Sequence, residues 1–199
     1  MQDVFVGREQ ELERVRRAVR RASDGATRWV HIVAQAGLGK TAVLERALAG
    51  GAGTPDDGTP QNERPGESVP DAVLPLYARA LEPSRLPPYG LLEPVVRHLL
   101  EIPGVRDGAD APHLELGLAG IAPHLVAADV ADRYARLEIG RAEQAVDAYL
   151  ESLLERACSL RVVLLGIDDA HGADAPSLRA LCRVVEERGD LRLAILTTA

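Results

Sequence analysis

Residues 29–48, WVHIVAQAGLGKTAVLERAL, combine an apolar run, a turn of small residues and an amphipathic segment. The turn from Ala34 to Thr41 fits the pattern A/G-x-x-x-x-G-K-S/T, in which a strand passes through a loop into a helix. Small residues let successive backbone N–H groups surround phosphate oxygens, and the amino end of the helix adds partial positive charge. The pattern predicts a phosphate-binding loop formed by Ala34, Gln35, Ala36, Gly37, Leu38, Gly39, Lys40 and Thr41.

Lys40 is the one lysine in a chain with 23 basic residues; all the others are arginines. A compact, flexible ammonium group suits a cluster of phosphates better than the planar fork of arginine does. Lys40 is therefore expected to neutralise the outer phosphates, and the Thr41 hydroxyl to ligate Mg²⁺. The alternative is a glycine-containing turn with a solvated lysine, which the surrounding strand and helix pattern disfavours.

A pair of carboxylates, Asp168 and Asp169, follows the apolar run RVVLLGI at residues 161–167. Such a run predicts a strand buried on both faces, and ligands of open parallel sheets bind beyond the carboxyl ends of the strands. Asp168 is expected to hold Mg²⁺, directly or through water, and Asp169 to act catalytically by orienting or deprotonating the attacking water. Taken alone, the pair fits a solvated acidic turn equally well; the upstream loop favours the metal site.

Apolar periodicity predicts the elements that position these residues. The expected helices span 8–22, 89–100, 132–157 and 176–187, and the expected strands after the first span 72–80, 161–167 and 191–196. Pro75 indicates that the strand over 72–80 lies at an edge or carries a bulge. We expect one α/β domain over residues 1–199, with a flexible loop insertion at residues 50–71.

Net charge, apolar runs and cysteine spacing exclude several classes of function. The net charge of −7 argues against direct nucleic-acid binding. The amino terminus lacks an apolar leader and no run approaches 18 apolar residues, which predicts a cytoplasmic protein without membrane contact. Cys158 and Cys182 lack metal-binding spacing and are expected to be small buried residues.

Four segments in order, FVGREQEL, AQAGLGKT, LLGIDDAHGADAPSLRAL and LAILTTA, resemble the ATPase domain of STAND-class regulators. Within that class they are most similar to the AAA-like domain at the front of large LuxR-type transcriptional regulators. The resemblance implies a P-loop NTPase fold, a three-layer sandwich with a mainly parallel sheet. It also implies that Val6, Gly7 and Arg8 lie near the nucleotide, and that Thr197 or Thr198 lies near the position that senses the γ-phosphate.

Departures from the family are also visible. Ala34 stands where the stricter loop pattern has Gly, and Gly172 where the family often has Trp. The family continues past the position of Ala199 with an arginine, a fifth strand, a lid, helical repeats and a DNA-binding helix-turn-helix. The comparison implies a fold without the last strand and lid, with regulatory and DNA-binding domains expected in full-length relatives. The first strand would then be an unpaired edge open to self-association.

The resulting prediction is binding of ATP and Mg²⁺, with weak hydrolysis of ATP to ADP and phosphate left open. The resemblance implies a role as the amino-terminal switch module of a signal-responsive transcription regulator. An alternative from another class is a non-catalytic nucleotide-binding or protein-interaction scaffold. A small-molecule kinase is a third option, disfavoured because no arginine-rich lid segment follows the late strands.

Overall fold

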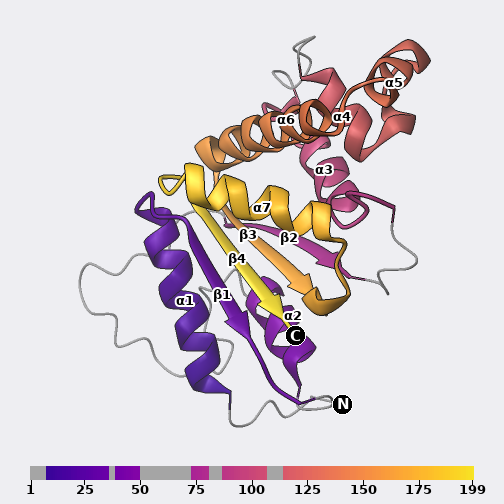
Figure 1. The fold of residues 1–199 in the computed structure, drawn as a ribbon. Coiled ribbons are helices and arrows are strands. Elements are labelled where there is room, and N and C mark those ends of the chain that lie inside the picture. Colours follow the sequence, from indigo (N-terminus) through magenta and orange to yellow (C-terminus); the bar gives the residue numbers. More distant parts are fainter. Residues whose placement is uncertain (1–7, 36–38, 50–72, 81–86, 107–113) are drawn as a thin grey trace.

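The computed structural model describes residues 8–35, 39–49, 73–80, 87–106 and 114–199. In these residues a four-stranded sheet has the order β1-β4-β3-β2, and every neighbouring pair is parallel. Its strands are β1 (Arg28–Ile32), β2 (Val73–Arg79), β3 (Val162–Asp168) and β4 (Leu193–Thr198). Figure 1 shows the four arrows pointing the same way. The predicted α/β fold with a parallel sheet is confirmed.

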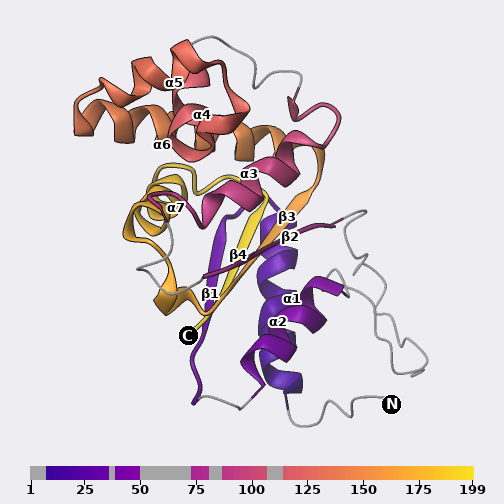
Figure 2. The same ribbon diagram turned by 90° about the vertical axis from the view of Figure 1, so that its right-hand side faces the viewer.

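Helices cover both faces of the sheet, which gives three layers (Figures 1 and 2). One face packs against α1 (Glu9–Ser23) and α2 (Lys40–Ala49), the other against α3 (Leu92–Leu100), α6 (Ile139–Leu160) and α7 (Ala175–Glu187). The remaining described helices, farther from the sheet, are α4 (Glu115–Ile121) and α5 (Ala128–Ala135), with short 3-10 turns at Pro123–Leu125 and Ala170–Gly172. The core is therefore divided by the sheet into two apolar clusters.

Strand β3 is buried along its whole length because its two faces meet these two clusters. Val163 and Leu165 face α3, α6 and α7, while Val162 and Leu164 face α1 and α2. Burying each such side chain contributes about 1.5–3 kcal/mol. The strand that ends at Asp168 is thus anchored from both sides. Strand β2 lies at the opposite edge from β1, as Pro75 predicts.

The predicted single helix over residues 132–157 is wrong. The structure has two helices, α5 and α6, because Glu138 has an extended backbone with φ −63° and ψ 147°. The break lets Tyr134 at the end of α5 pack against Gly120 of α4, where an added Cβ would lie 2.6 Å from the tyrosine ring. Apolar periodicity continues in both helices, so the pattern alone does not reveal the turn between them.

The two cysteines differ in environment. Cys158 is buried as predicted, and burial raises the pKa of its thiol to about 12. Cys182 is exposed, contrary to the prediction. It lies one position beyond Leu181, and the inward positions of α7 are instead occupied by Ser177, Ala180, Leu181 and Val184.

Asp174 joins α7 to the turn that precedes α3. Its carboxylate accepts hydrogen bonds from the N–H and the hydroxyl of Ser177, at 2.9 and 2.8 Å, and so caps α7. It also accepts from the N–H groups of Tyr89 and Leu91, at 2.9 and 3.1 Å. Tyr89 has a φ of 63°, in the left-handed region that only a well-supported turn holds. One buried side chain therefore ties together segments 85 positions apart.

Replacing this carboxylate should destabilise the fold. Asp174→Ala is expected to lower the free energy of unfolding by about 3 kcal/mol. The change removes a helix cap and leaves two further buried N–H groups without their acceptor. Urea denaturation measures the change. Asp132→Ala, at an exposed position of α5, is the control and should stay within about 0.5 kcal/mol of the parent. A loss below about 1 kcal/mol for Asp174→Ala contradicts the role assigned to it.

Candidate functional site

The carboxyl ends of the central strands and the start of α2 meet at one edge of the sheet (Figures 1 and 2). The hydroxyl of Thr41, in the first turn of α2, lies 3.2 and 3.1 Å from the two carboxylate oxygens of Asp168, the last residue of β3. The two residues are 127 positions apart in the sequence. The fold therefore brings together the two side chains that the sequence analysis assigned to Mg²⁺.

Asp168 is fully buried, with 0% of its surface exposed. A second hydroxyl, that of Thr198 on β4, donates to its Oδ1 at 2.6 Å. No cationic side chain forms an ion pair with Asp168 within the part of the chain that the structure describes. A buried carboxylate is unfavourable unless a cation pairs with it or it coordinates a metal. The side-chain hydrogen bonds described for the Asp168 carboxylate come from the neutral hydroxyls of Thr41 and Thr198. The arrangement therefore fits a cation bound beside this carboxylate.

Lys40 reaches back to Ala34, the first residue of the predicted phosphate loop. Its Nζ donates a hydrogen bond of 2.6 Å to the carbonyl oxygen of Ala34, at the beginning of that loop. Gly39 turns the chain into α2 with a φ of 75°, a conformation that favours glycine, and its carbonyl accepts the N–H of Val43 at 3.1 Å. The ammonium group is thus held beside the loop by an uncharged acceptor, which an anionic ligand can replace. Gln35, the last described residue before the gap at 36–38, is exposed.

The remaining residues of the predicted nucleotide site are not all described. Arg8 precedes α1, and its guanidinium lies 2.6 Å from the carboxylate of Glu11 in the first turn of that helix. This contact supports the start of α1, and the nucleotide contact predicted for Arg8 stays a prediction. The predicted residues outside the described ranges are Val6, Gly7, Ala36, Gly37 and Leu38.

The two threonines that end β4 point to opposite faces of the sheet. Thr198 faces α2 and bonds to Asp168, whereas Thr197 faces the other layer, where its hydroxyl meets Trp29 Nε1 at 3.1 Å and His31 Nδ1 at 2.6 Å. Side chains alternate along a strand, so only one of two neighbours can reach the same site. The structure brings Thr198, not Thr197, to the cluster around Asp168.

Asp169 adopts a left-handed backbone conformation, with φ 54° and ψ 43°. Its N–H donates to the Thr198 hydroxyl at 3.0 Å, and its carboxylate forms an ion pair of 3.3 Å with Arg79 at the end of β2. Both partners of the pair are partly exposed, at 59% for Arg79 and 35% for Asp169, so the pair contributes at most about 1 kcal/mol. The carboxylate is directed toward β2 by a contact that is easily exchanged.

Arg79 is a residue of this site that local sequence patterns do not reveal. A signal was present, because Arg79 is the second-last residue of the strand predicted over 72–80, and the ends of parallel strands meet at one edge. The register pairs Arg79 with Asp168, one position before the aspartate that it contacts. Identifying Arg79 requires knowing that β2 neighbours β3, and strand order is not visible in the local sequence.

The described residues contain no group of three or more His, Cys, Asp and Glu side chains that could hold a metal. In the same part of the chain, no helix combines the length and the apolar character needed to cross a membrane.

Comparison with known proteins gives one result at the level of the family. A family model described as the AAA ATPase domain matches residues 4–196. No curated protein gives a significant match. The matched range contains the predicted phosphate loop, Thr41, Asp168 and Asp169. Only the last residues, from Thr197 onward, and the first three lie outside the match.

Asp168→Asn should separate the site's function from its effect on stability. The change removes a buried charge, while the amide oxygen still accepts the Thr198 hydrogen bond, so the free energy of unfolding should rise by about 1 kcal/mol. Mg²⁺ with ADP is expected to raise the Tm of the parent, and the variant should lose that rise. Differential scanning calorimetry measures both. Asp132→Asn is the exposed control, and a marked loss of stability in Asp168→Asn means that the carboxylate is a structural group.

Proposed function

The chain belongs to the AAA ATPase domain family, and from this premise we propose that Lys40, Thr41 and Asp168 form its Mg-ATP site. The observation that carries the proposal is the contact between the Thr41 hydroxyl and the Asp168 carboxylate. A hydroxyl at the start of a helix and a carboxylate at the end of a buried strand are the two protein groups that hold Mg²⁺ in P-loop NTPases.

Nucleotide binding would change the partners of these side chains. Lys40 leaves the Ala34 carbonyl oxygen for the outer phosphates, and the first N–H groups of α2 face the same anion. The Thr41 hydroxyl oxygen would ligate the metal, and Asp168 would ligate it too or accept a hydrogen bond from a metal-bound water, while Thr198 keeps its hydrogen bond to Asp168. Bound Mg²⁺ would neutralise part of the negative charge on the β- and γ-phosphates.

Hydrolysis requires a group that orients a water molecule for attack on the γ-phosphorus, in line with the bond that breaks. Asp169 follows Asp168 directly and is the proposed residue. Its carboxylate is paired with Arg79 at 3.3 Å, so it must exchange that partner to act on water. Water then attacks the γ-phosphorus, the bond to the β-γ bridging oxygen breaks, and the products are ADP and phosphate. We propose a weak ATPase on this basis.

The order of the sequence motifs supports a regulatory setting for this activity. In that setting the domain is the amino-terminal switch of a signal-responsive transcription regulator of the STAND class, whose further domains bind DNA. The ATP-bound and ADP-bound forms would favour different arrangements of the neighbouring domains. The support is the resemblance of four segments, from FVGREQEL to LAILTTA.

A non-catalytic scaffold is the second candidate, and the contact between Arg79 and Asp169 favours it. If that ion pair persists with nucleotide bound, the water-orienting carboxylate stays directed toward β2. The domain then binds Mg-ATP without turnover. Binding and turnover are therefore tested separately.

Lys40→Ala should lower the affinity for Mg-ATP by about 100-fold, because charge-assisted hydrogen bonds to phosphate contribute about 3 kcal/mol in total. Isothermal titration calorimetry measures the affinity. Arg17→Ala removes an exposed positive charge on α1 and should leave the affinity within about twofold of the parent. Unchanged binding by Lys40→Ala would falsify the proposed site.

Asp169→Asn should keep Mg-ATP affinity within about twofold and slow phosphate release by about 100-fold, because an amide cannot take up the proton of water. A steady-state phosphate assay gives the rate, and calorimetry gives the affinity of the same preparation. Equal rates for parent and variant indicate the scaffold. A parent that binds Mg-ATP but releases no phosphate also indicates the scaffold.

A further inference from the structure

Strand β2 is the last strand on its side of the sheet, and within the described ranges no segment pairs with its outer edge. The N–H of Ala80, directly after β2, donates to the carbonyl oxygen of Asp168 on β3 at 2.9 Å. Backbone groups point to alternate sides along a strand, so those of Tyr77 and Arg79 point away from β3. Pro75 also points outward, where its missing N–H costs no bond within the sheet. The outer edge thus offers the N–H groups of Tyr77 and Arg79 and the carbonyl oxygens of Pro75, Tyr77 and Arg79.

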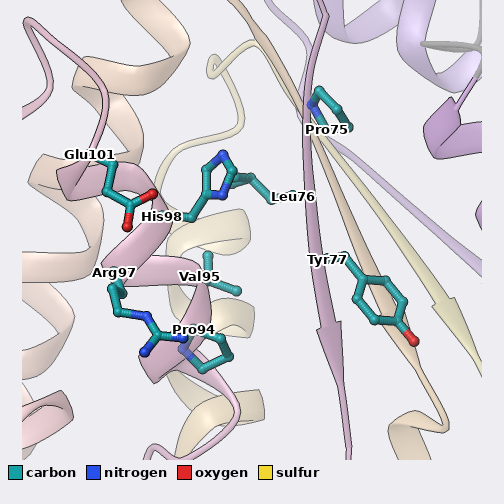
Figure 3. Close-up of a pocket in the computed structure, with 8 residues that line it drawn as sticks. All are labelled: Pro75, Leu76, Tyr77, Pro94, Val95, Arg97, His98 and Glu101. Carbon is teal, nitrogen blue, oxygen red and sulfur yellow. The ribbon is translucent and has the colours of Figure 1, made fainter.

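A hollow of about 350 Å³ lies along this edge, between β2 and α3. Its walls are residues 75–77 of β2 and one side of α3, from Pro94 to Glu101. Figure 3 shows the strand and the helix side by side, running in opposite directions. A peptide can add to an exposed sheet edge as a further strand, bound through its backbone by the strand and through alternate side chains by the neighbouring surface. The edge and the hollow together have the form of such a groove.

The helix wall of this groove carries two opposite charges. Arg97 and Glu101 lie one helical turn apart, both are exposed, and neither forms an ion pair with another side chain that the structure describes. The order with the base first is the less favourable one for a pair within a helix. Figure 3 shows Glu101 nearer the level of Pro75, and Arg97 nearer the level of Tyr77. A negative and then a positive group therefore follow each other along the direction of β2.

The spacing of these charges matches that of alternate residues in an extended peptide. Residues i and i+4 of a helix are about 6 Å apart along its axis, and residues i and i+2 of a strand are about 6.6 Å apart. Leu76 and Ala78 face the α3 side, and residues directly opposite each other in paired strands share a face. Peptide side chains opposite Leu76 and Ala78 would therefore project toward Glu101 and Arg97.

The direction of the added strand sets the order of its charges. Antiparallel pairs are slightly more stable than parallel ones, and a strand antiparallel to β2 runs in the same direction as α3. Its first charged residue then faces Arg97 and its second faces Glu101. The groove accordingly complements an acidic residue followed, two positions later, by a basic one.

We propose that the outer edge of β2 and the groove beside α3 bind an extended segment of a partner protein as an added antiparallel strand, with the pattern acidic–any–basic. The residue between the two charges lies opposite Tyr77 and exchanges two backbone hydrogen bonds with it. The missing N–H of Pro75 limits the ladder at one end and so restricts the register. The inference goes beyond the proposed Mg-ATP site and does not depend on nucleotide.

Two peptides test the groove on the whole chain, without nucleotide. The labelled heptapeptides Thr-Thr-Glu-Val-Arg-Thr-Thr and Thr-Thr-Arg-Val-Glu-Thr-Thr, with blocked ends, have the same composition and opposite charge order. Fluorescence anisotropy should show that the first binds about tenfold more tightly, because two attractive pairs become two repulsive ones in the second. The double variant Arg97→Glu with Glu101→Arg exchanges two exposed charges and should reverse this preference. Thermal unfolding verifies that the variant is folded.

Strand addition is tested by removing single backbone donors of the first peptide. N-methylation of its valine removes the N–H that would donate to the Tyr77 carbonyl oxygen, and should weaken binding about tenfold. N-methylation of the following arginine is the matched control. The N–H of that arginine would point away from β2, so the affinity should change by less than about threefold.

Each contrary result overturns the inference. Such results are equal affinity for the two charge orders, a preference that the double variant does not reverse, equal effects of the two N-methyl groups, and no binding of the first peptide to the folded parent. A parent that sediments as a dimer and binds neither peptide assigns the edge to a second copy, which also overturns it. These measurements contain no nucleotide, so their failure is distinct from a failure of Mg-ATP binding.

Discussion

The structure around the proposed site depends on one buried carboxylate, that of Asp168. Asp168 ends a strand packed on both faces, so it cannot move to water without disturbing two apolar clusters. Neutral hydroxyls share its charge but do not cancel it. A native protein keeps such an unfavourable group where its charge is needed. Three elements meet around this carboxylate. Helix α2 contributes Thr41, β4 contributes Thr198, and the end of β2 contributes Arg79, which pairs with the neighbouring Asp169.

In the proposed site, three side chains are already held by contacts that nucleotide and metal would replace. Lys40 is held by a carbonyl oxygen, Thr41 by Asp168, and Asp169 by Arg79. Each of these contacts can be exchanged: in two of them one partner is neutral, and the third is a partly exposed ion pair. Binding would therefore reorganise several side chains together, and a ligand shifts such an equilibrium by its difference in affinity for the two arrangements.

Much of this could be predicted from the sequence. The buried strand ending in Asp168 and the parallel sheet follow from local patterns of residue type and spacing, and β2 lies at an edge, one of the two possibilities that Pro75 indicated. The division of 132–157 into two helices did not follow, because the packing of Tyr134 against Gly120, which accompanies the turn, is a contact with another helix, α4.

The sequence by itself determined which chemical groups this protein offers: an ammonium and a hydroxyl at a helix start, and a carboxylate pair after a buried strand. These are contiguous motifs whose geometry is set by local backbone conformation. Only the tertiary structure decided that Thr198 and not Thr197 faces Asp168, and that Arg79 at the end of β2 pairs with Asp169. The physical reason is that side chains alternate along a strand. Which of them meet therefore depends on strand order, on register and on the face that α2 covers.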